Sequence, residues 1–370
     1  MSHPGSFRFW FLFRPVLGAA VLAASVFGQT PSSARAEKIV PLPEILMVSS
    51  VRVSDDRIYV ADGRSREIYA YALDNFRLLK KIGRSGQGPG EFETAPQPVL
   101  LPDEMAAKSF SKIVFFSKEG EFRREVKILP SDLMFSGFPV FPLEGRYVGF
   151  PFVRDERGRM TSCVGRIYEE DWKTAAEFTA PFPSPTPSPP PPPGAKSAGP
   201  KEEMLLIKDY CQATVAGGRI YFADSRKGLS VSVFDARGAK IREIRPETTV
   251  VRVDPKFRDE LIAAWREDMK KYLEFYTPFV PDVFPALFAF RVDGAEIHAV
   301  TPRGRDGLYE IITMNLEGTI LRRSFSFPLE PTWDYLPEVD HRFDIHGGIL
   351  YTTSYNEEKE RMELRIASLK

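Results

Sequence analysis

Three histidines follow the N-terminal segment of this 370-residue chain: His298, His341 and His346. Three is the smallest number of protein ligands from which catalytic zinc sites are built. His341 and His346 lie five residues apart on one segment, and on a β-strand this odd spacing directs two side chains to opposite faces. We therefore expect no cofactor and interpret the histidines as isolated surface or core residues, with a zinc or calcium site as the alternative.

Other groupings that could catalyse a reaction are weak. The chain contains no Gly-x-Ser-x-Gly nucleophile motif. Asp62 and Asp224 each end one of two similar segments, where a carboxylate usually accepts hydrogen bonds from backbone N–H groups of a turn. A ring of such acids could bind calcium, but only these two copies are clear. We assign no catalytic residue and expect a protein that is not an enzyme.

The two cysteines, Cys163 and Cys211, stand on either side of a proline-rich stretch. In an oxidising compartment they could form a disulfide that ties the two ends of this stretch together. The alternative is a pair of buried thiols, since reduced cysteine behaves as a small hydrophobic residue. The sequence leaves both possibilities open.

These residues belong to a chain that repeats one structural unit. Residues 57–62 read Arg-Ile-Tyr-Val-Ala-Asp and residues 219–224 read Arg-Ile-Tyr-Phe-Ala-Asp, with five of six positions identical. Alternating apolar residues follow both segments, which is typical of half-buried β-strands. Repetition at this distance indicates an architecture of stacked supersecondary units.

A tight hairpin recurs after these strands. Each copy has a bulky apolar residue, three turn residues, then Gly or Asn and a second strand; the copies cover residues 71–75, 116–120, 234–238 and 314–318. A type I turn closed by a residue at positive φ makes a compact hairpin, and Gly or Asn tolerates that conformation best. The repeated unit is therefore strand, tight turn, strand.

The units predict an all-β fold: a six-bladed β-propeller of four-stranded antiparallel blades, spanning residues 37–370. The expected units cover residues 50–106, 107–135, 136–182, 205–250, 285–330 and 340–370. A blade buries both of its faces only between two others, so the units must close into a ring. We expect residues 37–46 to add a strand to the last blade, which removes a free sheet edge.

Two insertions interrupt the repeat. Residues 181–201 contain five consecutive prolines and predict an extended, solvated spacer. Within residues 254–276 we expect one α-helix over about 255–275, with Asp254 as its cap and Pro255 in its first turn. The following segment, residues 276–285, is rich in aromatics and prolines and could lie over one face of the ring.

Residues 1–36 have a basic start, a short apolar run and an Ala-Arg-Ala end, which are typical of a signal peptide. We expect an exported protein, periplasmic or secreted, with no transmembrane domain after cleavage; an uncleaved anchor is the alternative. Lysine plus arginine and aspartate plus glutamate balance at 50 each. The protein therefore has no overall positive electrostatic field that would attract nucleic acid. We expect no nucleic acid as a partner.

The doubled Ile-Tyr-x-Ala-Asp strands, together with the glycine-rich segment Ile82-Gly-Arg-Ser-Gly-Gln-Gly-Pro-Gly-Glu-Phe92, resemble the NHL-type six-bladed propellers that many bacteria export. The resemblance implies the fold and little about a ligand. We expect a monomeric binding scaffold for a protein, small molecule or glycan; the alternative is a propeller hydrolase or lyase with a metal ion in the central channel. The candidate ligand-binding residues are Arg84, Gln87, Glu91, Tyr276 and Phe279.

Overall fold

The computed structural model describes residues 38–134, 136, 138–154, 156, 160–183, 201–207, 211–270, 273–305, 307–328 and 342–369. All of them belong to one compact unit, residues 35–370. The predicted signal peptide, most of the proline-rich stretch and His341 lie outside the described residues.

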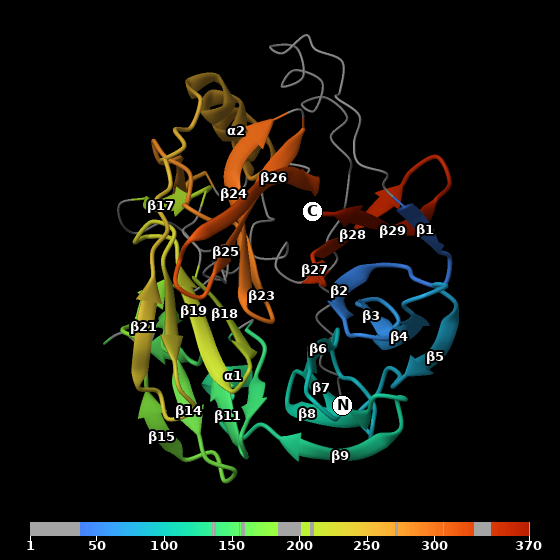
Figure 1. The fold of residues 1–370 in the computed structure, drawn as a ribbon. Coiled ribbons are helices and arrows are strands. Elements are labelled where there is room, and N and C mark those ends of the chain that lie inside the picture. The colour runs from blue at the N-terminus through green and yellow to red at the C-terminus, as the bar shows by residue number, and fades with distance from the viewer. Residues whose placement is uncertain are drawn as a thin grey trace, which may run out of the picture. The chain divides into compact units, whose positions relative to one another are not determined.

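Six four-stranded antiparallel sheets follow one another around a ring and form a six-bladed β-propeller, as the sequence predicts (Figure 1). Blades 1 and 2 consist of β2 (Val48–Val53), β3 (Arg57–Asp62), β4 (Glu67–Ala72), β5 (Leu78–Ile82), β6 (Gln97–Leu100), β7 (Glu104–Ser109), β8 (Lys112–Ser117) and β9 (Phe122–Lys127). Blades 3 and 4 consist of β10 (Phe141–Leu143), β11 (Arg146–Gly149), β14 (Arg166–Tyr168), β15 (Thr174–Glu177), β18 (Cys211–Ala216), β19 (Arg219–Asp224), β20 (Val231–Phe234) and β21 (Lys240–Ile244). Blades 5 and 6 consist of β23 (Ala289–Asp293), β24 (Glu296–Arg305), β25 (Leu308–Asn315), β26 (Ile320–Pro328), β27 (Phe343–His346), β28 (Ile349–Asn356), β29 (Arg361–Ser368) and β1 (Lys38–Leu42).

The ring closes through its first strand. β1 pairs antiparallel with β29, with Lys38 opposite Ile366 and Leu42 opposite Met362. In Figure 1 the blue β1 accordingly lies beside the red β29. The expected closing strand is confirmed, and it gives the last blade its fourth strand where an open edge would otherwise remain.

The structure shifts two of the expected unit boundaries. The second blade begins at β6, so the expected division at residue 107 is wrong by about two strands. Within the expected third unit, residues 136–182, the strands β12 (Phe152–Arg154) and β13 (Met160–Cys163) do not join the blade. They form a separate sheet with β16 (Phe182–Pro183).

The recurring hairpins take the expected geometry at glycine. Gly120, Gly238 and Gly318 have φ values of 81°, 85° and 89°. In the first copy the positive φ falls on Phe76, at 61°, where Asn75 was expected. The reason is one extra turn residue: Phe76 N–H bonds to the Ala72 carbonyl, whereas Gly120 N–H bonds to the nearer Ser117 carbonyl.

Hydrophobic clusters fill the spaces between adjacent blades. Between blades 1 and 2, for example, Tyr59, Ile68, Phe92 and Phe116 are all at most 2% exposed. Removing apolar surface from water is the main favourable term for folding, at roughly 25 cal/mol per Å². Because each blade buries both faces in this way, the blades stabilise one another around the ring.

Polar side chains link the innermost strands of neighbouring blades. Gln212 on β18 donates to the carbonyl of Phe288 at 2.6 Å and accepts from the N–H of Phe290 at 3.0 Å. One residue of blade 4 thus satisfies two backbone groups of blade 5. The inner strand of a propeller blade is an exposed sheet edge, and such an edge needs partners other than a fifth strand.

The next two junctions use charged groups in the same way. Arg291 on β23 donates to the carbonyl of Phe343 on β27 at 3.0 Å, and its guanidinium lies over the Phe343 ring. Asp344 on β27 accepts from the N–H of Val53 on β2 at 2.8 Å. Burial raises the pKa of Asp344, although Arg52 and Arg291 favour its charged form. Blades 5, 6 and 1 are therefore joined at the ring centre through Arg291 and Asp344.

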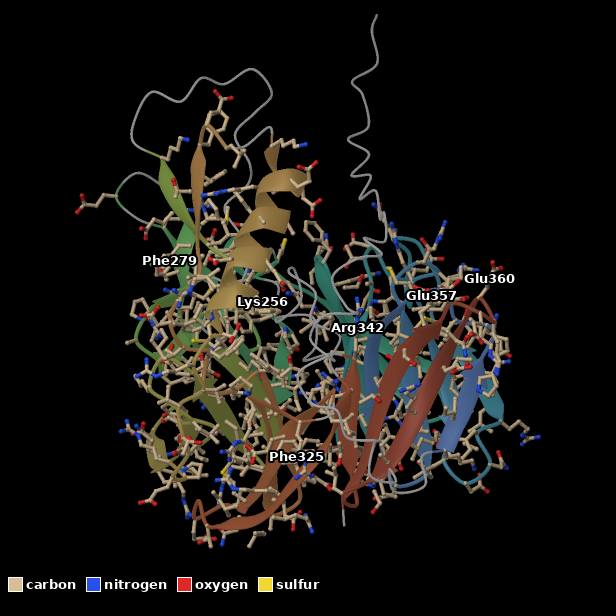
Figure 2. All side chains as sticks on the ribbon, turned by 90° about the horizontal axis from the view of Figure 1, so that it is seen from above. Lys256, Phe279, Phe325, Arg342, Glu357 and Glu360 are labelled. Atoms are coloured by element: carbon tan, nitrogen blue, oxygen red, sulfur yellow. The ribbon has the colours of Figure 1, made fainter. Side chains whose placement is uncertain are left out.

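The insertion between blades 4 and 5 contains the predicted helix, α2 (Pro255–Asp268). Asp254 caps it, accepting from the N–H groups of Lys256 and Phe257. The helix ends seven residues before the expected position 275, so Leu273 lies beyond it. Beside it β17 (Glu202–Leu205) pairs in parallel with β22 (Tyr276–Phe279), and a short helix, α1 (Ser131–Met134), follows blade 2. Figure 2 shows Lys256 and Phe279 in the same part of the molecule.

Candidate functional site

The antiparallel order of each blade creates two distinct ends of the ring. The turns after the first and third strands lie at one end, which we call the turn end. The segments that lead from one blade to the next lie at the other, which we call the connector end. The insertions that contain β12, β13, β17, β22 and α2 leave the ring from the connector end. The described turns after the first and third strands are short, and β1 begins and β29 ends at this turn end.

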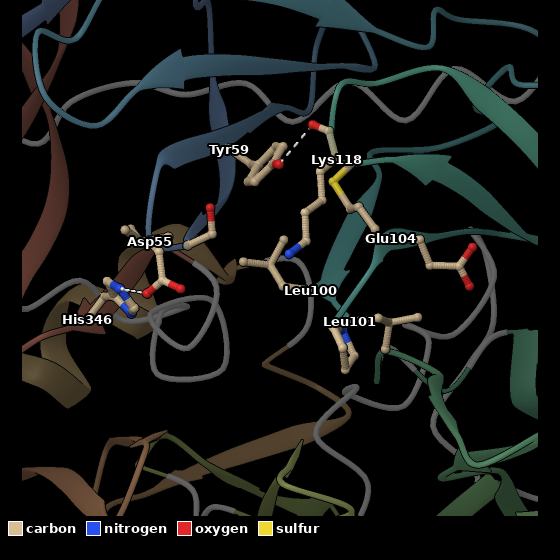
Figure 3. Close-up of a pocket in the computed structure, with 11 residues that line it drawn as sticks. Asp55, Tyr59, Leu100, Leu101, Glu104, Lys118 and His346 are labelled. Atoms are coloured by element: carbon tan, nitrogen blue, oxygen red, sulfur yellow. Dashed lines mark hydrogen bonds and ion pairs between the residues drawn. The ribbon is translucent and has the colours of Figure 1, made fainter.

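A cavity of about 280 Å³ lies at the turn end, where blades 1, 2 and 6 meet. Its walls come from the first turns of blades 1 and 2, the third turn of blade 2 and the end of β27. The lining residues are Val53, Ser54, Asp55, Tyr59, Leu100, Leu101, Pro102, Glu104, Met105, Lys118 and His346 (Figure 3). We call this cavity the mouth pocket. Its size is close to the lower limit for pockets that bind small molecules.

His346 forms one wall of the mouth pocket. Its Nε2 lies 3.0 Å from Asp55 Oδ1, and its Nδ1 lies 3.6 Å from Asp293 Oδ1. The three residues belong to blades 6, 1 and 5, and Figure 3 shows the His346–Asp55 contact. Asp55 is fully exposed at its side chain, so its second oxygen can accept a hydrogen bond from a ligand.

Lys118 forms the opposite wall. Its carbonyl accepts hydrogen bonds from the Tyr59 hydroxyl at 3.0 Å and from the Arg57 guanidinium. Burial raises the pKa of Tyr59, which keeps that hydroxyl a donor. These bonds from blade 1 fix the backbone of the turn, and in Figure 3 the lysine side chain extends into the pocket between Tyr59 and Leu100.

The remaining lining is apolar or already neutralised. Val53 and Met105 are buried, and Leu100 and Leu101 are half-buried. Glu104 forms a bidentate pair with Arg124, at 2.7 and 2.9 Å, and its carboxylate points away from Lys118 in Figure 3. The pocket thus has an apolar floor, a histidine–carboxylate pair on one wall and an ammonium on the other.

The structure places the predicted residues of the glycine-rich segment elsewhere, in the connector between blades 1 and 2. Glu91 accepts from Arg84 Nε at 2.7 Å and from the N–H of Gly88 at 2.8 Å. These hydrogen bonds lower the pKa of Glu91, led by the one from Gly88. The buried Lys112 ammonium bonds to the carbonyls of Gln87 and Gly88. Arg84, Gln87 and Glu91 all lie at the connector end, away from the mouth pocket.

This segment also has a clear packing role. Phe92 is completely buried between blades 1 and 2. Gly83 has φ of +71°, and a Cβ at this position would lie 2.3 Å from the Phe92 ring. The glycine is therefore required by the chain path and by the ring that follows it.

Tyr276 and Phe279, the other two predicted ligand-binding residues, lie on β22 in the insertion after blade 4. Tyr276 is buried, whereas Phe279 is 45% exposed. The five predicted residues therefore fall in two separate connectors and not in one site. Their role as ligand contacts stays a prediction.

His298 and His346 do not share a site in the described part of the ring. His298 is fully buried on β24, its Nδ1 lies 3.0 Å from Thr313 Oγ1, and burial lowers its pKa. Its Nε2 lies 3.7 Å from Glu296 Oε2. Among the described residues, no three His, Cys, Asp or Glu side chains are grouped so as to hold a metal ion. His341 lies outside them.

The repeated aspartates have structural roles. Asp62 is fully buried and accepts from the N–H groups of Leu46 and Met47, which join the last blade to the first. Asp224 forms a salt bridge with Arg226 at 2.7 Å. Both positions support the turn interpretation made from the sequence.

Cys163 and Cys211 pack in the same hydrophobic cluster, which also contains Phe152 and Phe182. Cys163 is fully buried and Cys211 is partly buried. A disulfide between them stays a prediction.

Sequence reasoning missed three residues of the mouth pocket: Asp55, Tyr59 and Lys118. Tyr59 and Lys118 both stand within segments that the repeat identified. A position-by-position comparison of the hairpins would have singled out Lys118, because its equivalents are apolar. Asp55 has no comparable signal, since its role depends on a histidine that is distant in the sequence.

The comparisons with known proteins add the following. No family model and no curated protein matches the chain. A candidate exported protein of Bacteroides fragilis is similar in structure, with a TM-score of 0.49 and 10% identity over 92% of this chain and 98% of that one. A streptogramin B lyase has a TM-score of 0.40 and 10% identity over 89% and 97%. KlHsv2 with loop 6CD replaced by a Gly-Ser linker has a TM-score of 0.33 and 7% identity over 86% and 83%. No described helix is long and apolar enough to cross a membrane.

Proposed function

We propose that this protein is an exported, NHL-type propeller that binds a small molecule in the mouth pocket without transforming it. The export rests on the signal-like residues 1–36 and the NHL relationship on the glycine-rich segment and doubled strands. The observation that carries the binding function is the mouth pocket itself. It combines a volume of about 280 Å³ with converging side chains from three blades.

The location of the pocket supports this proposal. Binding residues commonly lie on loops that a rigid scaffold positions, and here the scaffold is a ring whose blades are locked together at their inner strands. An apolar floor with a few polar groups is the usual composition of a small-molecule site. The His346–Asp55 pair offers a ring nitrogen and carboxylate oxygens for hydrogen bonds, and its role in this proposal is recognition.

The test is a screen of small organic compounds against the purified mature chain, read out by thermal stabilisation. Leu101→Trp fills the mouth pocket, and Leu129→Trp is the matched control at an exposed position outside it. We expect compounds that stabilise the native protein and Leu129→Trp but not Leu101→Trp, since a ligand stabilises only the state it binds.

Two results would contradict the proposal. One is a set of ligands that stabilises all three proteins equally, which would place the site elsewhere. The other is stoichiometric zinc or calcium in the purified protein together with hydrolase or lyase activity that depends on it, which would establish the metal-dependent alternative.

A further inference from the structure

We propose that the ligand of the mouth pocket is a small organic carboxylate with an apolar body, held by the Lys118 ammonium. This inference rests on the proposed function, because it names the class of ligand for the same pocket. It comes from a departure from the internal repeat, from the charges around the pocket and from the shape of its floor.

Lys118 breaks the pattern of the repeated hairpins. The equivalent residues are Leu73 in blade 1, Ala236 in blade 4 and Leu316 in blade 5. Each of these three is partly buried against the hydrophobic cluster beside its blade. The same turn in blade 2 therefore has room for an apolar residue but carries a half-buried lysine instead.

The charge of Lys118 is not balanced within the described part of the protein. No salt bridge or side-chain hydrogen bond of its ammonium is present there, whereas the charged groups around it are engaged. Glu104 is held by Arg124, and Asp55 lies 3.0 Å from His346 Nε2. The nearby Glu119 lies 3.6 Å from Arg57. A half-buried lysine whose ammonium has no side-chain partner among the described residues can bind an anion through charge-assisted hydrogen bonds.

The surroundings favour a carboxylate over a phosphate. Phosphate sites usually combine arginine forks or several backbone N–H groups, and the mouth pocket offers one lysine. The Asp55 carboxylate on the opposite wall also opposes a doubly charged anion. A single carboxylate at Lys118 would leave the rest of the ligand against Leu100, Leu101 and Met105, with a hydroxyl or amine in reach of Asp55.

The experiment compares 4-methylpentanoate with its neutral amide, 4-methylpentanamide, as probes of the mature chain by titration calorimetry or NMR. We expect the carboxylate to bind with a Kd of about 1 mM or tighter and at least tenfold more tightly than the amide. Lys118→Leu, which restores the residue of blades 1 and 5, should abolish this preference and leave the protein at least as stable. Lys118→Arg should retain the preference.

Lys173→Leu is the matched control. Lys173 lies in the corresponding turn of blade 3, is 83% exposed and pairs with Asp171 at 2.7 Å. The Lys173→Leu substitution removes the same charge from the turn end but does not alter the lining of the mouth pocket. The preference for the carboxylate over the amide should therefore persist. Loss of the preference in Lys173→Leu as well would show a general charge effect and overturn the assignment to Lys118.

Other results also overturn the inference. They are equal binding of the two probes, no binding of the carboxylate, or an unchanged preference in Lys118→Leu. The inference and the proposed function can fail separately. If Leu101→Trp abolishes the binding of screened ligands while Lys118→Leu leaves it intact, the pocket is functional and only the ligand class is wrong.

Discussion

Two lysines of blade 2, Lys108 on β7 and Lys118 after β8, lie in contrasting environments. Lys108 is only 5% exposed, and its ammonium donates to the carbonyl of Phe138 at 2.7 Å and that of Leu133 at 3.4 Å. Lys118 is half-buried beside the mouth pocket, where no side-chain partner among the described residues holds its ammonium. The Lys108 ammonium is thus held by backbone carbonyls in the interior, whereas the Lys118 ammonium lies beside a cavity and is suited to bind a ligand.

The same contrast separates the ring centre from the turn end. At the centre, Gln212, Arg291 and Asp344 bond to backbone groups of the next blade. At the turn end, Asp55 and Lys118 keep bonding capacity for a ligand. We therefore expect substitutions at the centre to change stability, and substitutions at the turn end to change binding with little effect on stability.

The largest expected effect is that of Asp344→Ala. The change removes the acceptor of the Val53 N–H and leaves Arg291 without its acidic neighbour at 3.4 Å. Loss of the acceptor of a buried N–H, together with loss of the carboxylate beside a buried guanidinium, should lower the free energy of unfolding by about 3 kcal/mol in urea denaturation. Asp55→Ala, which removes an exposed carboxylate, should change it by less than about 0.5 kcal/mol. Equal losses for the two variants would abolish the distinction between centre and turn end.

The second prediction concerns the pH dependence contributed by Lys108. Burial lowers the pKa of Lys108 from 10.5 to about 8. Between these values the unfolded chain binds the proton and the folded chain does not, so stability rises with pH. Relative to Lys108→Met, the native protein should gain about 2 kcal/mol between about pH 8 and pH 9.5 in denaturant titrations. If the free energy of unfolding changes with pH in the same way for both proteins, this prediction is wrong.

The smallest of the three effects is expected for Gln212→Ala. Two backbone groups of blade 5, the Phe288 carbonyl and the Phe290 N–H, lose their partner. We expect a loss of about 1–2 kcal/mol in the free energy of unfolding. Gln87→Ala is a suitable control, because the contact of Gln87 with Lys112 uses its backbone carbonyl. If Gln87→Ala lowers the free energy of unfolding by the same amount, the hydrogen bonds of Gln212 between blades 4 and 5 make no specific contribution to stability.

Much of the fold could be predicted because it depends on local patterns. The doubled strand ending in Asp62 and Asp224, and the glycine at each hairpin, identified the repeated unit directly. Errors arose where partners, and not local preference, decide the outcome. The strands β12 and β13 fall within the expected third unit, yet they pair with β16 outside the blade.

The candidate site could be predicted far less well. The glycine-rich segment attracted attention because its composition is unusual, but that composition serves a tight chain path over Phe92. Tyr276 and Phe279 were chosen for aromatic character and lie on β22, in a separate connector. In this segment the unusual composition reflects the backbone geometry. It does not indicate which side chains come together in a binding site.

The repeated hairpin, the antiparallel blades, the helix that Asp254 caps and the strand that closes the ring could all be predicted from the amino-acid sequence. These follow from turn geometry and from hydrophobic alternation over a few residues. Only the tertiary structure decided that Asp344 would bond to Val53, 291 residues away, and that His346, Asp55 and Lys118 would line one cavity. The reason is that closure of the ring brings together residues from opposite ends of the chain, and no local pattern encodes such a meeting.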